Sequence, residues 1–181
     1  MKKEQILHGG ACLQVIKGDI VQQPDMDAIA NAANAFLRIG GGVAGAIHKA
    51  AGPELEKEAI KKGPIKPGQA VITKAYNLPN KHVIHVLGPV FDRDIPHDKL
   101  LANCYINALN ICEEYRLKSI AFPAISTGVF GYPVEEAAPV ALQAIYDKMP
   151  ELKSVKIIRM VVWTDRDYNE HVNAMLNLEK S

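Results

Sequence analysis

Two apolar patterns alternate along this chain of 181 residues, and the alternation limits its possible folds more than any other feature. Short runs rich in β-branched residues predict buried strands, and longer stretches with helical spacing predict helices. The predicted strands are Cys12–Lys17, Ala28–Asn31, Ala70–Thr73, Val83–Val86, Ser119–Pro123 and Val155–Val162. The predicted helices are Val43–Ala51, Glu54–Lys62, Lys99–Tyr115, Val134–Met149 and Asp165–Leu178. This order predicts an α/β fold with helices on both faces of a sheet.

The composition narrows the kinds of partner. The formal net charge is +1, so the chain lacks the broad basic surface on which non-specific nucleic-acid binding depends, and nucleic acid is not an expected partner. An anionic ligand would have to be held by local geometry, such as backbone N–H groups. No apolar run reaches the length of a membrane span, and residues 1–10 lack the apolar core of a signal peptide. The length and the absence of a long linker predict one domain over residues 1–181.

The cysteines and histidines predict no metal site. Cys104 and Cys112 fall in an apolar helical pattern, which favours buried free thiols, and the three cysteines of the chain form no CxxC pair. Reduced thiols are typical of the cytoplasm, where we expect this protein. His82 and His85 are spaced poorly for zinc, and His48 has no partner at metal-ligand spacing. We expect neither a metal nor a cofactor.

A glycine-rich segment, Gly40–Gly45, directly precedes a predicted helix. Glycines let the backbone approach a ligand closely, and the start of a helix presents unpaired N–H groups to an anion. The segment fits the GxGxxG pattern of dinucleotide-binding turns. However, eight residues separate it from the strand ending at Asn31, and the next strand, Ala70–Thr73, does not end in an acidic residue that would bind a ribose. A nicotinamide-dependent oxidoreductase is therefore the weaker hypothesis, and a turn that serves only packing is a further alternative.

A second glycine-containing loop, Ser126–Pro133, follows an apolar strand and leads into another predicted helix. It would supply a second set of backbone donors, so that two opposed loops clamp a diphosphate with almost no side-chain charge. No lysine follows either loop as it does in a P-loop, which argues against a P-loop nucleotidase. Ser126 and Thr127 lack an obvious His–Asp partner, so turn hydrogen bonding is a better interpretation than nucleophilic catalysis.

Polar and aromatic residues follow several of the predicted strands. In open α/β sheets, ligands bind outside the carboxyl ends of the strands. Asp19 can accept a hydrogen bond from an adenine amino group, or it can serve only as a turn residue. Asn31 and Asn34 can hydrogen-bond ribose hydroxyls or a positioned water, or they can merely hold their loop. Trp163, the only tryptophan, can stack on a base or pack in the core.

Taken in order, these segments resemble the macrodomain family. The resemblance spans roughly Cys12 to Leu176, and its motifs are specific together although each is weak alone. The matching segments are Gly18–Ile20, Asn31–Asn34, Gly40–Gly52, His85–Pro89 and Phe122–Pro133. The resemblance implies a three-layer α/β/α sandwich with a mixed, mostly parallel central sheet and an ADP-ribose cleft across its top. It also implies ADP-ribose and ADP-ribosylated proteins as partners.

The resemblance further implies a role for each matching residue. Asp19 would accept from the adenine amino group beside the backbone of Ile20, and Trp163 would lie against the adenine. Asn34 would hydrogen-bond the distal ribose near the reacting carbon, as the catalytic residue. The diphosphate and the distal ribose would be lined by Gly41, Gly42, Val43, Ser126, Gly128, Val129, Phe130 and Gly131.

One position departs from the best-known hydrolases of the family. Ala44 stands where that subclass carries an aspartate, and relatives with alanine there include both binders and hydrolases. We expect ADP-ribose binding coupled to hydrolysis of mono-ADP-ribosyl esters on acidic side chains, or of O-acetyl-ADP-ribose. Water would be held between Asn34 and a diphosphate oxygen. The alternatives are a non-catalytic ADP-ribose reader and an ADP-ribose-1″-phosphate phosphatase.

Overall fold

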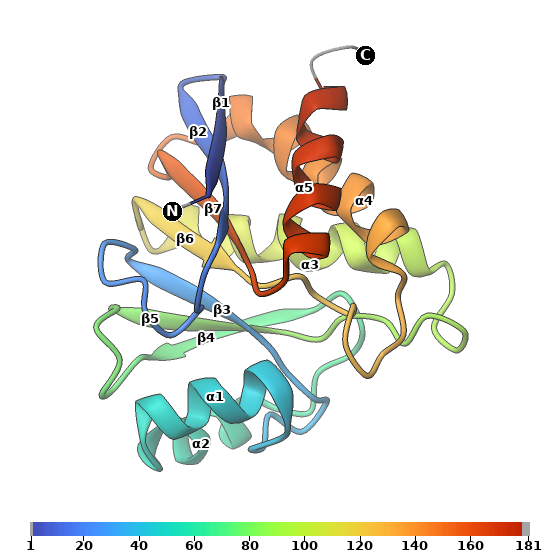
Figure 1. Cartoon of the computed structure of the whole chain (residues 1–181). Helices are drawn as coiled ribbons and strands as arrows, with labels where there is room; N and C mark the ends of the chain where they lie inside the picture. Colours follow the sequence, from blue (N-terminus) through green and yellow to red (C-terminus); the bar gives the residue numbers. More distant parts are fainter. Residues whose placement is uncertain (1, 179–181) are drawn as a thin grey trace.

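A computed structural model describes residues 2–178 of the chain. Within these residues, seven strands form one sheet, which five α-helices cover (Figure 1). The strands are β1 (Lys3–His8), β2 (Ala11–Lys17), β3 (Ala28–Ala32), β4 (Ala70–Lys74), β5 (His82–Val86), β6 (Ser119–Phe122) and β7 (Ile157–Val162). The α-helices are α1 (Gly42–Ala51), α2 (Glu54–Ala59), α3 (His97–Glu114), α4 (Val134–Lys148) and α5 (Asp165–Leu178). Short 3₁₀ helices, Ile60–Lys62 and Met149–Glu151, extend α2 and α4.

The sheet is mixed and mostly parallel. Its strand order is β1-β2-β7-β6-β3-β5-β4, and only the outer pairs, β1 with β2 and β4 with β5, are antiparallel. The other four pairs are parallel. The carboxyl ends of β2, β7, β6, β3 and β5 therefore meet at one edge of the sheet. That edge is where an open α/β sheet binds ligands.

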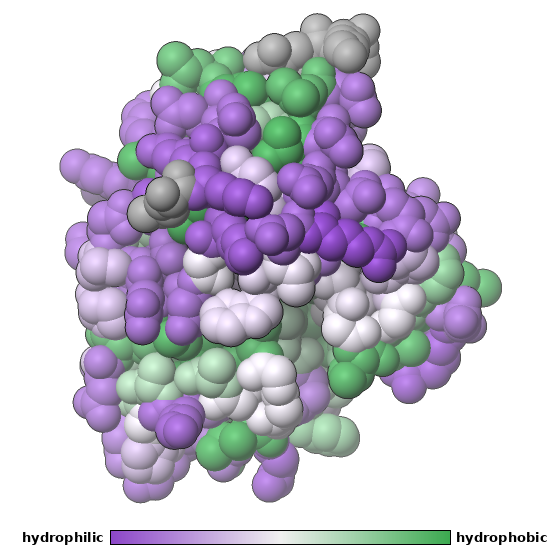
Figure 2. Space-filling model, in the orientation of Figure 1, coloured by the Kyte–Doolittle hydropathy of each residue, from purple (hydrophilic) through white to green (hydrophobic). Residues whose placement is uncertain are grey.

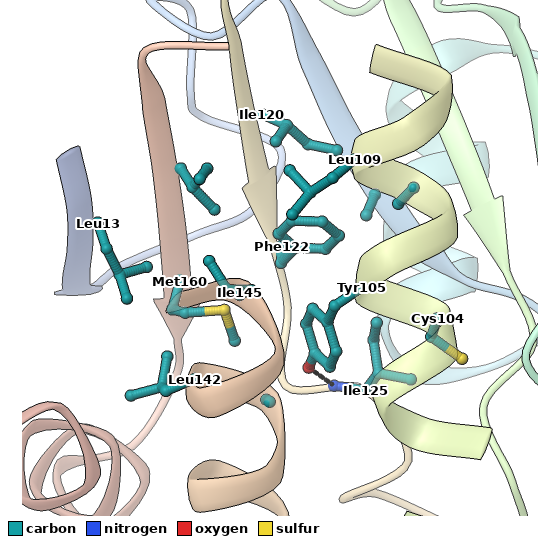
Figure 3. Close-up of a cluster of buried hydrophobic side chains, with 14 of the residues drawn as sticks. Leu13, Cys104, Tyr105, Leu109, Ile120, Phe122, Ile125, Leu142, Ile145 and Met160 are labelled. Atoms are coloured by element: carbon teal, nitrogen blue, oxygen red, sulfur yellow. Dashed lines mark hydrogen bonds between the residues drawn. The ribbon is translucent and has the colours of Figure 1, made fainter. Parts of the chain in front are cut away.

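Helices cover both faces of the sheet, which confirms the predicted three-layer α/β/α arrangement. The larger apolar core lies under α3, α4 and α5, and a smaller core lies under α1 and α2 (Figure 1). Every residue of β6 is buried, as expected for a strand covered on both faces. Figure 3 shows the larger core, where Phe122 of β6 packs against Tyr105 of α3 with ring centroids 4.9 Å apart.

Tyr105 also fixes the chain as it leaves β6. Its buried hydroxyl accepts the N–H of Ile125 at 3.2 Å (Figure 3). It also donates to the carbonyl of Pro123 at 3.5 Å. Burial raises the pKa of the Tyr105 hydroxyl, so it keeps the proton that it donates. The loop that follows β6 therefore starts from a fixed point in the core.

The strand β1 was not predicted from the sequence. Only Ile6 of its six residues is buried, because β1 is the outermost strand and leaves most of its side chains in solvent. A strand of this kind carries no alternating apolar pattern. The detectable signal is the turn, in which Gly9 and Gly10 have φ angles of 57° and 86°, the geometry of a two-residue hairpin.

Two further sequence expectations concern the thiols and the membrane. Cys104 and Cys112 are buried free thiols, as predicted, and burial raises the pKa of Cys104 to about 12, which makes it unreactive. Among residues 2–178, no helix combines the length and the apolar character that crossing a membrane requires.

Candidate functional site

Two pockets lie side by side at the carboxyl edge of the sheet. The first, here the Trp163 pocket, has a volume of about 370 Å³ and is lined by Gly18, Asp19, Ile20, Gly42, Val43, Ala46, Pro123, Val161 and Trp163. The second, here the Phe130 pocket, has a volume of about 350 Å³ and is lined by Ala32, Gly41, Gly42, Val43, Ala124, Ser126, Gly128, Val129 and Phe130. Because both include Gly42 and Val43, they form one cleft over the start of α1. Figure 2 shows a hollow in this region, between the surface over α1 and the surface in front of α5.

Asp19 places a carboxylate in the Trp163 pocket. Gly18 continues the sheet, with its N–H bonded to the carbonyl of Val162 at 2.9 Å, and the chain then turns. One carboxylate oxygen of Asp19 accepts the N–H of Val21 at 3.1 Å. No residue between 2 and 178 donates a hydrogen bond to its other oxygen. Asp19 is thus both a turn residue and a half-buried acceptor open to a ligand.

Trp163 follows β7 directly and is not a core residue. Its side chain is 71% exposed, although it lines the same pocket as Asp19. A large ring that stays exposed beside an acceptor can cover the flat face of a base. Of the two interpretations of Trp163 in the sequence, the structure thus contradicts core packing.

The start of α1 presents free donors to the centre of the cleft. Gly41 is the residue before the helix, no side chain caps it, and the first turn contains no acidic residue. The first N–H groups of a helix have no partner within the helix. Since Gly42 and Val43 face both pockets, their N–H groups can bind an anion where the pockets meet.

Glycine is required at two points of this turn. Gly42 has a φ of 56°, and a Cβ atom there would project into open space, which is the cleft itself. A Cβ atom on Gly45 would lie 2.5 Å from the carbonyl oxygen of Gly40, so any larger residue would push the turn away from the helix. The segment Gly40–Gly45 therefore has two effects. It lets the turn pack closely against the start of α1, and it leaves the centre of the cleft open.

The loop after β6 forms the opposite wall of the Phe130 pocket. Its turn is closed by hydrogen bonds from Gly131 N–H to the carbonyl of Gly128 and from Tyr132 N–H to the carbonyl of Ser126, both 3.0 Å. Ser126 has a φ of 68°, and its buried hydroxyl has no hydrogen-bond partner within residues 2–178. The loop is also tied to the segment before α3, because Phe91 donates its N–H to the carbonyl of Phe130 at 2.9 Å.

Asn34 holds its own loop. Its side-chain NH₂ donates to the carbonyl of Arg38 at 2.8 Å, and its side-chain oxygen accepts the N–H of Arg38 at 3.1 Å. An amide has two N–H donors and two acceptor sites, so one of each remains available. Asn34 does not line either pocket, but its nitrogen approaches Gly40, the residue before the glycines that do. The loop-holding function is thus observed, and it is compatible with one further contact to a ligand.

A row of buried polar side chains lies beneath the Phe130 end of the cleft. The amide nitrogen of Asn31 is 3.1 Å from Nδ1 of His85, and Nε2 of His85 is 3.0 Å from Oγ1 of Thr73. Burial, assisted by the charge of nearby His48, lowers the pKa of His85 to about 3, so this ring is neutral. A neutral ring accepts from Asn31 and donates to Thr73, which links β3, β5 and β4 below α1.

Comparison with known proteins decides the family. The Macro domain family matches residues 30–141. An O-acetyl-ADP-ribose deacetylase of Escherichia fergusonii is 50% identical over 141 residues, which cover 75% of this chain and 78% of the relative. This protein is a member of the macro domain family.

Solved macrodomain structures share the whole fold. The Oceanobacillus iheyensis macrodomain with ADP superposes with a TM-score of 0.93 and 38% identity, over 99% of this chain and 97% of the other. The Trypanosoma brucei macrodomain in complex with ADP-ribose superposes with a TM-score of 0.84 and 32% identity, over 90% of this chain and 68% of the other.

The macro domain fold gathers most of the site residues named from the sequence. Asp19, Ile20 and Trp163 line one pocket, and Gly42 and Val43 line both. Those in the Phe130 pocket alone are Gly41, Ser126, Gly128, Val129 and Phe130. Asn34 and Gly131 line neither pocket.

The sequence interpretation missed small residues of the macro domain cleft. Ala32, Ala124 and Pro123 come directly after strands or end one, and Ala46 lies one turn into α1 after Val43. Their positions at strand ends are a signal that could have found them, whereas their side chains carry no chemistry that attracts notice. Among residues 2–178, no three histidine, cysteine or acidic side chains are grouped so as to bind a metal.

Proposed function

We propose that this macro domain binds ADP-ribose along the cleft. The adenine would occupy the Trp163 pocket, with its amino group donating to the free oxygen of Asp19. The diphosphate would accept from the N–H groups of Gly42 and Val43, and the distal ribose would occupy the Phe130 pocket. The observation that carries this proposal is the joining of two similar pockets at the uncapped start of α1. The likeness to a macrodomain in complex with ADP-ribose supports it.

We further propose that the protein hydrolyses ADP-ribosyl esters. The substrates would be O-acetyl-ADP-ribose or mono-ADP-ribosyl esters on acidic side chains of proteins. Residues 1–181 would act as one domain, located in the cytoplasm. The 50% identity to an O-acetyl-ADP-ribose deacetylase supports this activity. With Ala44 in place of an acidic residue, the attacking water would be held by Asn34 and a diphosphate oxygen of the substrate. Positioning alone can lower a barrier by roughly 7–11 kcal/mol in the best cases.

Calorimetric titration with ADP-ribose, AMP and NAD tests the binding proposal. We expect the tightest binding for ADP-ribose, because only this ligand fills both pockets and keeps a free hydroxyl in place of a substituent on its distal ribose. AMP should lose the contacts of the Phe130 pocket. NAD carries nicotinamide where ADP-ribose has a free hydroxyl on the distal ribose, so it should lose the hydrogen bonds of that hydroxyl. Equal affinity for AMP and ADP-ribose would contradict the assignment of the Phe130 pocket.

Label release from a glutamate-ADP-ribosylated protein, and deacetylation of O-acetyl-ADP-ribose, test the hydrolase proposal. Asn34→Ala is the informative variant if its affinity for ADP-ribose is measured in parallel. Reduced turnover with retained binding would support a role in the chemical step. Tight binding without any turnover by the native protein would instead identify a reader. Phosphate release from ADP-ribose-1″-phosphate would identify the phosphatase.

A further inference from the structure

Three large apolar side chains are exposed on the two loops that flank the Phe130 pocket. Val129 is 100% exposed and lines the pocket, while Phe36 and Ile39 are 63% and 56% exposed. Phe36 and Ile39 belong to the loop that runs from Asn34 to Gly41, and Gly41 lines the same pocket as Val129. Single exposed apolar residues are normal on a protein surface, but several around one opening mark a binding surface.

The two loops that flank this pocket contribute to one apolar cluster. Phe130 packs against the apolar cluster that contains Leu37, and Ala35 packs against the same cluster. Phe36 lies between two residues of this cluster, which Phe130, the neighbour of Val129, also joins. We call Phe36, Arg38, Ile39 and Val129 the distal rim.

The loop that carries the rim is held from three directions. Asn34 bonds both backbone groups of Arg38. The N–H of Ile39 donates to the carboxylate of Glu56 at 2.5 Å, and the carbonyl of Ala35 accepts the N–H of Ile65 at 2.8 Å. The apolar side chains are thus held on the outside by a fixed backbone, which lowers the entropy cost of binding a partner there.

The rim also carries unpaired positive charge. Arg38 lies between Phe36 and Ile39, and its side chain forms no ion pair with any residue from 2 to 178. Lys61 and Lys66, which flank the segment bonded to Ala35, likewise form no ion pair within that range. The hydrogen bond from the N–H of Ile39 leaves the negative charge of Glu56 in place, against the three positive charges of Arg38, Lys61 and Lys66. Such a surface complements a partner that is acidic and partly apolar.

We infer that the distal rim binds the polypeptide segment around the modified acidic residue of an ADP-ribosylated protein. Apolar side chains of that segment would contact Phe36, Ile39 and Val129, and further carboxylates would face Arg38. The inference rests on the proposed ADP-ribose binding, because the rim lies where the distal ribose would leave the cleft.

Binding of two ligands by one double variant tests the inference. The ligands are free ADP-ribose and an acidic peptide that carries ADP-ribose through a non-hydrolysable linkage, and the variant combines Phe36→Ser with Arg38→Glu. We expect the native protein to bind the peptide conjugate more tightly than free ADP-ribose. The variant should bind the conjugate about tenfold more weakly, from one lost apolar anchor and one reversed charge, with unchanged affinity for free ADP-ribose.

A matched control makes comparable changes elsewhere, since it also replaces an exposed apolar side chain by serine and a basic side chain by glutamate. Leu7→Ser with Lys99→Glu alters an exposed apolar residue on β1 and an exposed lysine in the first turn of α3. This control should bind both ligands like the native protein. Equal loss of both ligands in the rim variant would overturn the inference, since the rim would then act only by supporting the cleft. Equal affinity of the native protein for conjugate and free ligand would overturn it as well.

The binding proposal, the hydrolase proposal and the rim inference fail in different ways. If the native protein does not bind free ADP-ribose, the proposed function falls, and the rim inference falls with it. If it binds ADP-ribose but turns over no ester, only the hydrolase proposal falls, because the comparison of the two ligands requires no turnover.

Discussion

The two pockets of the cleft are built by different means. The Trp163 pocket offers side chains, a half-buried carboxylate from Asp19 and an exposed indole ring. Apart from the hydroxyl of Ser126, the polar groups of the Phe130 pocket are backbone groups, chiefly of the turn before α1 and the loop after β6. Side chains can discriminate one base from another, whereas main-chain N–H groups bind any anion of suitable shape. Substitutions should therefore separate base selectivity from diphosphate binding.

The residues buried beneath the two pockets also differ, because one set is apolar and the other is polar. The Trp163 pocket rests on apolar residues, among them Ile16, Ile20 and Val161. Beneath the other end, β3 carries Asn31, whose hydrogen bond to His85 starts the buried polar row. A buried polar group must keep its partners, so the Phe130 end should be the more sensitive to protonation.

The largest effect on binding is expected at Gly42, which the two pockets share. Gly42→Val would fill the open space at the centre of the cleft and obstruct the helix N–H groups. Loss of two hydrogen bonds to a charged diphosphate costs about 3 kcal/mol, so the affinity for ADP-ribose should fall roughly 100-fold by calorimetry.

Gly10→Val is the matched control for this change. Gly10 has a φ of 86° and, like Gly42, would extend a Cβ atom into open space, but it lies in the β1–β2 turn. Both variants should lose about 1–2 kcal/mol of stability from the left-handed backbone in thermal unfolding. Only Gly42→Val should lose binding. If Gly42→Val bound ADP-ribose with native affinity, the diphosphate would not bind at the start of α1, where the two pockets meet.

Stability should fall with acid because of the polar row beneath the Phe130 end. The pKa of His85 is about 3 in the folded protein, against 6.5 for an ordinary histidine, chiefly because of burial. Above pH 6.5 the ring is neutral in both states and contributes no pH dependence. Between pH 6.5 and about pH 3, only the unfolded chain binds the proton. For each pH unit of acidification in this range, protonation of His85 in the unfolded chain should lower the free energy of unfolding by about 1.4 kcal/mol, which urea titrations would measure.

His85→Gln checks the origin of that pH dependence. Glutamine offers one acceptor for Asn31 and one donor for Thr73, but it does not titrate. The variant should show a shallower loss of stability between pH 6.5 and pH 4. Burial also lowers the pKa values of His48 and His171, so part of the slope should persist. An unchanged slope would show that His85 is not the group responsible.

Most of the fold follows from local patterns in the sequence. The strands in the middle of the sheet are buried on both faces, so they appear as continuous apolar runs, and the helices keep one apolar stripe. The strand β1 escaped prediction because one buried residue, Ile6, cannot form a pattern. The order of strands in the sheet depends on contacts between distant segments, and no local pattern encodes it.

The site was predictable where a residue type has few uses. A tryptophan at the end of a strand, or a glycine run before a helix, suggests a ligand, and the structure gathers Trp163 and Gly42 in one cleft. The polar row was not predictable, since Asn31, Thr73 and His85 come from three strands and meet only through the pairing of β3, β5 and β4. The double hydrogen bond of Asn34 to Arg38 likewise depends on a loop conformation that the sequence does not specify.

A smaller effect on binding, confined to the base, is expected at Asp19. Asp19→Asn keeps an oxygen for the N–H of Val21, so the turn should survive. It removes the negative charge that would accept from the adenine amino group, a loss of about tenfold in affinity. The measurement compares ADP-ribose with its hypoxanthine analogue, which lacks that amino group. The native protein should prefer adenine, and the variant should bind both bases about equally.

The smallest effect is expected at Trp163. Its ring is 71% exposed, so Trp163→Ala leaves no cavity in the core, and the unfolding temperature should not change. Loss of stacking on a base costs about 1 kcal/mol, which predicts roughly fivefold weaker binding of ADP-ribose. Trp163→Phe, which keeps an aromatic face, should recover most of this affinity. Because the proposed contact of the ring is with the base alone, AMP and ADP-ribose should lose affinity by the same factor. A larger loss for ADP-ribose would mean that Trp163 also shapes the Phe130 end, and the division of the cleft into a side-chain half and a backbone half would fail.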